Sequence, residues 1–377
     1  MAETYSNLES HIFGPMKYIE GYGVLEKLGY FGSFLGNRVL LVGSPTSLDQ
    51  ALPAIKKSLE EAGIIWDVYQ FDGFPTEQAA QKIADITKAG HFDFLIGIGG
   101  GRVMDVTKYG ADLSERRLIL IPTISATNAS LRVNSIVYDD KGRHQGMHKN
   151  QLPACFTLAD LDILTKQPVR YLASGILDTL VRFIEMRPYL SVYPDDLNTK
   201  VSYAVIEEAY HFLISHSKEY LQDLKEQKPT KRLAEAIQCV IGVCSISANY
   251  NSTGSKFGGL AHGVYYGFTR SRENHHLLHG EVVGFGILTQ LFAEGYELDE
   301  IRKEYQHLHL FGFDYDLEDC GILTDQELDE AVDYIYQVRL PGIGFLPGKT
   351  KKDIKEAILK ANALILEERS LAHEKSV

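Results

Sequence analysis

Hydrophobic and polar positions in the first part of the chain follow two alternating patterns. Four short apolar runs have the length and composition of buried strands: 38–43, 64–69, 92–98 and 117–121. Apolar residues at helical spacing separate these runs, with Thr76 as an N-cap and with Gly63 and Gly90 as stop signals. Strands that alternate with helices predict βαβ units and a parallel sheet.

The pattern changes after Asp162. Alternation of β-branched residues becomes scarce, and long segments with helical spacing dominate: 201–220, 232–248, 282–292 and 352–366. We therefore place a boundary near residue 162, between an α/β domain at 1–162 and a helical domain at 163–377.

The composition excludes some partners. The 377 residues include 38 Lys and Arg against 50 Asp and Glu, which gives a formal net charge of −12 and a pI near 5.6. A partner such as nucleic acid or an anionic membrane would require a basic face, so neither is expected. A small anionic substrate stays open, because one local arginine can outweigh the overall charge.

The sequence also predicts a soluble cytoplasmic protein. No segment approaches the run of about 18 apolar residues that spans a bilayer. The first residues lack the basic and apolar regions of a secretory signal. The four cysteines form no C-x-x-C pair and are interpreted as buried thiols in a reducing compartment.

A glycine run follows the third predicted strand. Gly99, Gly100 and Gly101 stand directly before a predicted helix, where backbone amides and the helix N-terminus favour a phosphate group. The dinucleotide fingerprint G-x-G-x-x-G fails, because Arg102 occupies the place of its third glycine. A tight turn without a ligand is the alternative; three consecutive glycines favour phosphate binding. The hydroxyl-rich loop 122–130 follows the next strand and is a second candidate for a cofactor or substrate contact.

Four of the 13 histidines lie within 18 residues: His262, His275, His276 and His279. A divalent metal with an open coordination position needs about three protein ligands, typically histidine with a carboxylate. Asp178, acidic within an apolar segment, is the best candidate for that carboxylate. Surface or capping histidines are the alternative, which we accept for His276.

Together these residues resemble the glycerol dehydrogenase branch of the iron-activated alcohol dehydrogenase and dehydroquinate synthase superfamily. The resemblance implies a Rossmann-like α/β domain followed by an all-α domain, as in dehydroquinate synthase. It extends over nearly the whole chain and rests on an ordered set of segments: Tyr18–Gly29, Gly99–Asp105, Pro122–Ile124, Asp178–Leu180, Ala261–His262 and Leu278–Glu281.

The resemblance implies a role for several residues. Asp178, His262 and His279 match the three metal ligands of the family. Iron-type members add a histidine at the place of Arg182, so zinc is the metal that the resemblance favours here. The positions that match cofactor contacts, for NAD or NADP, are Gly99, Gly100, Gly101, Arg102, Asp105, Thr123, Ala126 and Tyr138.

Several positions depart from the family pattern. Ser44 stands where NAD-using relatives often carry an acid, so NAD and NADP both stay open. Asn128 replaces the aspartate that holds substrate hydroxyls in glycerol dehydrogenases, and Tyr265 replaces a histidine. Arg132 and Arg182 could hold a carboxylate or phosphate on the substrate. The alternative for each arginine is a solvated charge on a helix or loop, which is the commoner arrangement.

The sequence therefore predicts a metal-dependent, NAD(P)-linked dehydrogenase of a small alcohol or polyol, with His275 as a proton-relay residue. Reduction of 2-oxo acids is the main alternative, because Asn128, Arg132 and Arg182 would suit a carboxylate. A phosphorylated substrate and a nucleotide- and metal-binding protein without turnover are further alternatives. The family resemblance also implies a homo-oligomer.

Overall fold

The computed structural model describes residues 14–250, 259–271, 276–339 and 348–376. Its strands are β1 (Lys17–Gly21), β2 (Arg38–Gly43), β3 (Ile65–Gln70), β4 (Phe94–Gly99), β5 (Arg117–Pro122), β6 (Asn134–Tyr138), β7 (His144–Lys149) and β8 (Phe156–Asp160). Six of these described strands form a parallel sheet in the order β1-β8-β5-β4-β2-β3. The predicted parallel sheet is confirmed.

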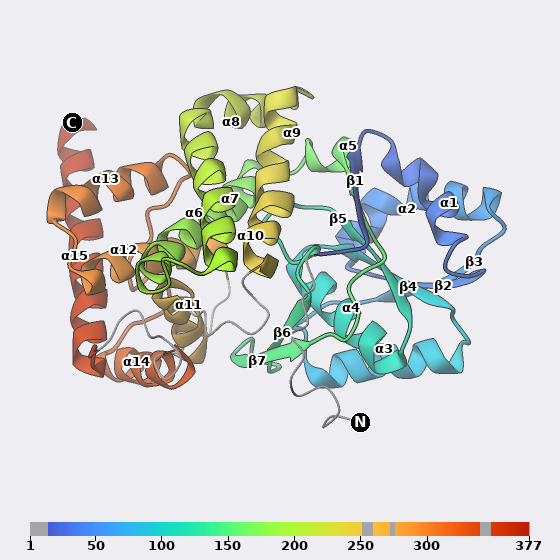
Figure 1. The fold of residues 1–377 in the computed structure, drawn as a ribbon, viewed down its shortest axis with the longest axis horizontal. Coiled ribbons are helices and arrows are strands. Elements are labelled where there is room, and N and C mark those ends of the chain that lie inside the picture. Colours follow the sequence, from blue (N-terminus) through green and yellow to red (C-terminus); the bar gives the residue numbers. More distant parts are fainter. Residues whose placement is uncertain (1–13, 251–258, 272–275, 340–347, 377) are drawn as a thin grey trace.

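Helices cover both faces of this sheet (Figure 1). They are α1 (Leu28–Gly32), α2 (Pro45–Glu61), α3 (Glu77–Ala89) and α4 (Gly101–Ser114). Because successive side chains of a strand point to opposite faces, Val39 and Leu41 of β2 pack with α1 and α2, while Leu40 and Val42 pack with α3 and α4. Two apolar cores result, which is why these strands are almost continuously hydrophobic.

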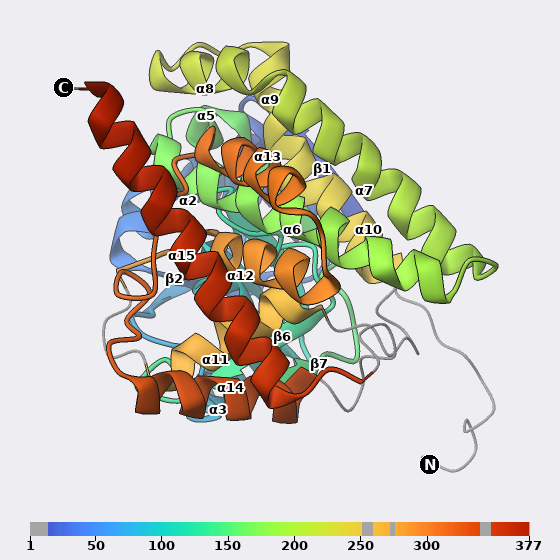
Figure 2. The same cartoon turned by 90° about the vertical axis from the view of Figure 1, so that its left-hand side faces the viewer.

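The second half of the described chain is helical and has its own core (Figures 1 and 2). Its helices are α5 (Leu161–Leu164), α6 (Val169–Val192), α7 (Leu197–Ser215), α8 (Ser217–Lys225), α9 (Lys231–Gln238), α10 (Cys244–Tyr250), α11 (Leu260–Ser271), α12 (His279–Glu294), α13 (Leu298–His309), α14 (Asp325–Arg339) and α15 (Lys351–Ser376). The predicted order, a parallel-sheet domain followed by a helical region, is confirmed. The boundary at residue 162 stays a prediction.

Two predicted helices differ in detail from the structure. The segment 201–220 is divided at His216, which separates α7 from α8. The segment 232–248 contains a π-helical turn, Cys239–Val243, between α9 and α10. Lys231–Tyr250 is also long and apolar enough to cross a membrane by length and composition, with a mean hydropathy of 1.2. Two thirds of its apolar 18-residue stretch is buried inside the fold, as is usual for a core helix.

The antiparallel hairpin of β6 and β7 joins the two halves and was not predicted. On one side, His148 Nε2 lies 2.7 Å from Asp112 Oδ2 on α4. On the other side, the amide of His144 donates to Thr269 Oγ1 on α11 at 3.0 Å, and Tyr334 on α14 donates to the His144 carbonyl at 2.8 Å. The hairpin thereby connects α4 of the parallel-sheet half with α11 and α14 of the helical half.

Candidate functional site

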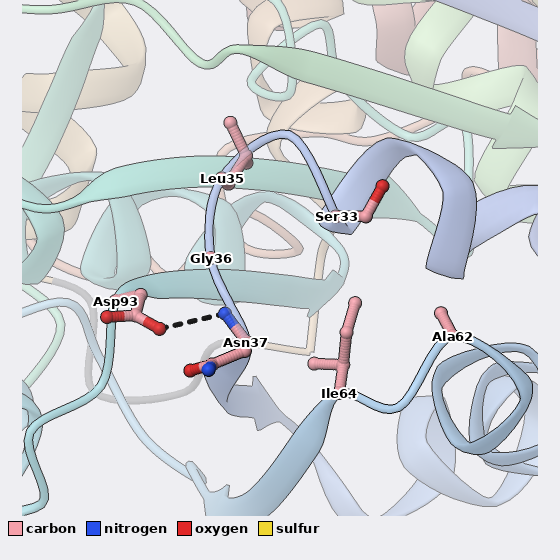
Figure 3. A pocket seen from close by; sticks show the side chains of 7 residues that line it. All are labelled: Ser33, Leu35, Gly36, Asn37, Ala62, Ile64 and Asp93. Carbon is pink, nitrogen blue, oxygen red and sulfur yellow. Dashed lines mark hydrogen bonds between the residues drawn. The ribbon is translucent and has the colours of Figure 1, made fainter.

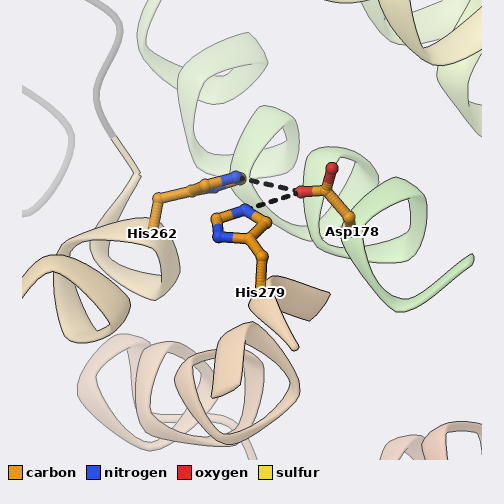
Figure 4. A group of neighbouring side chains, drawn as sticks. All are labelled: Asp178, His262 and His279. Carbon is orange, nitrogen blue, oxygen red and sulfur yellow. Dashed lines mark hydrogen bonds and ion pairs between the residues drawn. The ribbon is translucent and has the colours of Figure 1, made fainter. Parts of the chain in front are cut away.

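The three predicted metal ligands come together from three helices (Figure 4). Asp178 lies on α6, His262 on α11, and His279 is the first residue of α12. Asp178 Oδ1 is 3.3 Å from His262 Nε2 and 3.2 Å from His279 Nε2. One ligand atom from each residue lies within 4.8 Å of the other two. We call these three residues the ligand cluster.

Two glycines allow the helices of the ligand cluster to approach one another closely. A Cβ at Gly280 would lie 1.8 Å from the Ser174 carbonyl oxygen on α6. A Cβ at Gly286 would lie 2.3 Å from the Ala261 carbonyl oxygen on α11. Distances this short exclude any side chain, so these glycines set the spacing of α12 against both neighbours.

A Gly280→Ala substitution is expected to lower the free energy of unfolding by about 1–3 kcal/mol, because the added methyl must displace the backbone of α6. Gly21→Ala is the matched control, since a Cβ there meets nothing within 4 Å. Thermal unfolding of both variants checks this expectation. Equal shifts in the midpoint of the two variants would contradict the close approach at Gly280.

Glu185 orients the first histidine and was missed by sequence reasoning. Its Oε2 lies 2.8 Å from His262 Nδ1, and its Oε1 accepts the His262 backbone amide at 2.9 Å. Gly259 leaves room for this carboxyl, because a Cβ there would lie 1.8 Å from Glu185 Cδ. A histidine held through Nδ1 presents Nε2 to a metal, as is usual for histidine ligands.

The electrostatics of the ligand cluster favour a positive charge within it. Burial opposes ionisation of Asp178, but His279 and His262 outweigh burial and hold the pKa of its carboxyl below the usual value. Burial likewise opposes a charged imidazole at His262, yet Glu185 and Asp178 raise its pKa to about 9. Two imidazole nitrogens and a carboxylate that converge in this way suit a divalent cation such as zinc.

The glycine run lies at the carboxyl end of β4, as predicted. Gly99 has φ +156° and Gly100 is the N-cap of α4, so the chain turns from strand to helix within this run. The Gly99 carbonyl accepts the amide of Thr123 at 3.1 Å, which places the loop 122–130 beside the run. A Cβ at Gly101 would lie 3.2 Å from Thr127 Oγ1. The two predicted cofactor loops are therefore neighbours.

The other predicted cofactor positions lie in two kinds of surroundings: Arg102 and Tyr138 lie beside an aromatic ring, and Asp105 and Ala126 lie inside the fold. The Arg102 guanidinium lies 4.6 Å from the centre of the Phe74 ring, and that ring lies 6.1 Å from the ring of Tyr138. Asp105 and Ala126, in contrast, are buried. The Asp105 carboxylate lies 2.9 Å from Lys108 Nζ.

Lys108 holds the loop after residue 128 and was not predicted. Its ammonium donates to the carbonyls of Ala129 at 2.9 Å and Arg132 at 3.3 Å, and also to the carbonyl of Asn134. The Asp105 carboxylate lies against this buried ammonium as its ion-pair partner. An acid three residues before a lysine at the start of a helix was the signal available in the sequence.

Two tyrosines connect the cofactor positions with the ligand cluster. The hydroxyls of Tyr138 on β6 and Tyr265 on α11 lie 3.1 Å apart. The Tyr265 ring meets the His279 ring edge-on, with 4.2 Å between ring centres. Tyr265, which replaces a histidine of the family pattern, thus lies between Tyr138, a predicted cofactor contact, and His279, a predicted metal ligand.

The three predicted substrate residues all contact α10. Asn128 Nδ2 donates to Cys244 Sγ at 3.0 Å, Arg132 donates to Asn249 Oδ1 at 2.9 Å, and Arg182 donates to the Ser247 carbonyl at 3.3 Å. Arg182 is only 7% exposed. A solvated helix charge, the alternative considered for Arg182, is therefore wrong.

Three further predictions have different outcomes. His275 lies outside the described residues, so its role stays a prediction. His276 is exposed. Ser44 Oγ accepts the Ser47 amide at 3.2 Å and caps α2, while Ser47 donates to the Ile98 carbonyl at 2.7 Å. Ser44 thus stabilises the start of α2. This contact does not decide between NAD and NADP as the cofactor, so both stay open.

A surface pocket of about 470 Å³ lies far from these groups, at the amino end of the sheet (Figure 3). Its lining includes Asn37, Ile64 and Asp93, which directly precede strands β2, β3 and β4. Asp93 Oδ2 accepts the amides of Asn37 at 2.9 Å and Arg38 at 3.0 Å, so its carboxylate holds the strand start. Ligands of parallel sheets bind at the opposite, carboxyl end.

Comparisons with known proteins find similarity to dehydrogenases and reductases. The family model described as iron-containing alcohol dehydrogenase matches residues 15–161. A glycerol dehydrogenase from Escherichia coli O6:H1 is 28% identical over 320 residues, which cover 83% of this chain and 85% of the relative. A glycolaldehyde reductase from Halobacterium salinarum is 26% identical over 321 residues, covering 84% of this chain and 86% of the relative.

The fold agrees as well. The crystal structure of glycerol dehydrogenase from Schizosaccharomyces pombe superposes with a TM-score of 0.85 at 19% identity, covering 97% of this chain and 94% of that one. The chain is thus similar, in sequence and in fold, to the glycerol dehydrogenase-like branch of the iron-containing alcohol dehydrogenase superfamily. The resemblance inferred from the sequence is confirmed. In this chain, the ligand cluster and its Glu185 partner bring together side chains that could hold a metal.

Proposed function

We propose that the protein is a metal-dependent, NAD(P)-linked dehydrogenase that interconverts a small alcohol or polyol and its carbonyl compound. The ligand cluster is the single observation that carries this proposal, because its three donors, one oriented by Glu185, suit a catalytic metal with an open position. The net reaction converts an alcohol and NAD(P)⁺ into a carbonyl compound, NAD(P)H and one proton. The similarity to glycerol dehydrogenases supports the same reaction class.

Zinc is the metal that we propose. The ligand cluster supplies three protein ligands, and Arg182 follows Asp178 by one helical turn, where a fourth ligand would otherwise project. A guanidinium donates hydrogen bonds and has no lone pair to offer a metal. When bound, zinc would polarise the substrate oxygen and lower the pKa of its hydroxyl.

The chain's own residues position the reactants. The glycine run and the Thr123 loop would hold the pyrophosphate of the cofactor at the start of α4, since the amides there are not used by the helix. Tyr138, at the end of β6 nearest Tyr265 and His279, would lie on the nicotinamide side. The substrate would then lie between Tyr138, α10 and the ligand cluster.

A steady-state assay tests the proposed function. Protein stripped with a chelator and reloaded with Zn²⁺ is expected to reduce NAD⁺ or NADP⁺ with at least one of glycerol, 1,2-propanediol and 2-hydroxybutyrate. The stripped protein should be inactive until metal returns. Retention of cofactor binding with no metal-dependent turnover of any alcohol or carbonyl would contradict the proposal and favour a binding protein without turnover.

A further inference from the structure

A line of side-chain contacts runs from the glycine run to the ligand cluster. It begins at Arg102, the second residue of α4, whose guanidinium lies 4.6 Å from the centre of the Phe74 ring. The Phe74 ring lies 6.1 Å from the ring of Tyr138, the last residue of β6. The Tyr138 hydroxyl lies 3.1 Å from that of Tyr265, whose ring meets the His279 ring with 4.2 Å between centres. A predicted cofactor loop and a predicted metal ligand are thus linked through aromatic side chains.

The backbone that carries the two tyrosines is anchored in different parts of the fold. Tyr265 follows the predicted ligand His262 by three residues on α11, so the two residues lie on the same side of that helix. The amide of Tyr138 donates to the Pro75 carbonyl at 3.2 Å, which holds the end of β6 against the segment that carries Phe74. The hydrogen bond between the two hydroxyls therefore joins two separately anchored pieces of backbone.

Both ends of this line of contacts are accessible. The side chains of His262 and His279 are 20% and 22% exposed. Tyr138 and Tyr265 are also partly exposed, and Arg102 is exposed beside the glycine run. A metal at the ligand cluster and a cofactor on the glycine run would therefore each contact one end of the line.

Each contact restricts the rotation of the side chains that make it. With a metal bound, the His279 ring would be fixed, and the edge-on contact would limit the rotation of Tyr265. With a cofactor bound beside Tyr138, the shared hydrogen bond would limit Tyr265 from the other side. Binding of one ligand thus orders side chains that binding of the second would otherwise have to order, which favours the second binding step.

We propose that Tyr265 couples the cofactor and metal sites, so that each ligand raises the affinity of the protein for the other. Tyr265 is a positioning residue in this proposal, because it acts through His279 and Tyr138 rather than on the reacting atoms. The inference rests on the proposed function for the identity of the two ligands, zinc and NAD(P). Tyr265 replaces a histidine of the family pattern, and an imidazole has no phenolic hydroxyl to reach Tyr138, so the link depends on the residue that this chain carries.

Cofactor titrations with and without metal test the coupling. Calorimetry on the full chain, either stripped with a chelator or loaded with one equivalent of Zn²⁺, gives the dissociation constants of NADH and NADPH. The wild-type protein is expected to bind its preferred cofactor about 5- to 150-fold more tightly when Zn²⁺ is present, the usual range for coupling between two sites. Saturating cofactor should raise the affinity for Zn²⁺ by the same factor, measured by competition with a chelator.

Two substitutions remove the hydroxyl contact from either side. Tyr265→Phe keeps the ring against His279, so it should lose most of the coupling while the affinity for Zn²⁺ without cofactor changes little. Tyr138→Phe should lose the same share of the coupling. The double variant should lose no more than either single variant, because all three lack one and the same hydrogen bond.

Tyr203→Phe is the matched control. It removes a phenolic hydrogen bond of 3.0 Å to Glu207 within α7 and should retain the full coupling. Equal cofactor affinity with and without Zn²⁺ in the wild type, or full coupling in Tyr265→Phe, would overturn the inference. Additive losses in the double variant would also overturn it, because they would show that the two hydroxyls act separately.

The same titrations, read beside a turnover assay, separate this inference from the proposed function. Coupling that depends on Tyr265, in protein that converts no alcohol or carbonyl compound, would support the inference and refute the dehydrogenase. Turnover that requires Zn²⁺, with independent binding of cofactor and metal, would refute the coupling and leave the dehydrogenase standing. Binding of neither NADH nor NADPH would refute both.

Discussion

Replacing His279 with Ala is expected to reduce kcat/KM by about 10³-fold or more on the best alcohol substrate. The substitution removes one of three donors whose ligand atoms converge within 4.8 Å, and a metal held by two residues would be lost or misplaced. The expected loss corresponds to about 4 kcal/mol of transition-state stabilisation. His262→Ala should have a similar effect.

His276→Ala is the matched control for this prediction. His276 belongs to the same segment but is exposed, and its backbone carbonyl, which the substitution keeps, accepts from Arg170 at 2.8 Å. This variant should keep the wild-type rate and metal content. Steady-state kinetics and elemental analysis on the same preparations check both. An active His279→Ala variant that still carries one metal per chain would place the metal elsewhere.

Glu185→Gln is expected to weaken metal affinity by about 10- to 100-fold, the usual effect of removing the carboxylate behind a histidine ligand. Glutamine keeps the size of the side chain and can still accept a hydrogen bond from His262 Nδ1. It lacks the negative charge that makes the imidazole a stronger metal ligand. Because the ligands themselves are retained, excess metal should restore most of the wild-type kcat.

Glu304→Gln is the control, since Glu304 is also buried but binds Tyr210 on α7, away from the ligand cluster. Competition with a chelator of known affinity measures the dissociation constant of the metal in both variants. Unchanged affinity in Glu185→Gln would show that this carboxylate only packs against Gly259. Loss of kcat that metal cannot restore would show a role other than ligand orientation.

The apolar strands of the sheet could be predicted from sequence because both of their faces are buried. Strands β2, β4 and β5 lie within two residues of the predicted runs, since burial on both faces requires nearly continuous hydrophobic residues. The edge strand β3 lies within one residue of its predicted run, although it is only partly buried. The β6–β7 hairpin could not be found in this way. It contains Asn134, Ser135 and His148, and its stability depends on contacts with α4, α11 and α14 that are distant in sequence.

The candidate site could be predicted only in part. Asp178 and His279 are about a hundred residues apart, so no local pattern relates them, and the family resemblance supplied the pairing. Glu185 lies seven residues after Asp178 and Arg182 four, which places all three on one face of α6. That helical spacing was a signal for Glu185 within the sequence. The contacts of α10 with Asn128 and Arg132 required the structure, because the residues in contact are 116 and 117 positions apart in sequence.

The central claim is that the ligand cluster binds one catalytic metal ion. Titration of metal-free protein with Zn²⁺, followed by dehydrogenase activity, tests it most directly. The wild-type protein should gain activity linearly and reach a plateau at one equivalent per chain, whereas Asp178→Asn should gain almost none over the same range. Full activity of the metal-free protein, or an Asp178→Asn titration that matches the wild type, would contradict the claim.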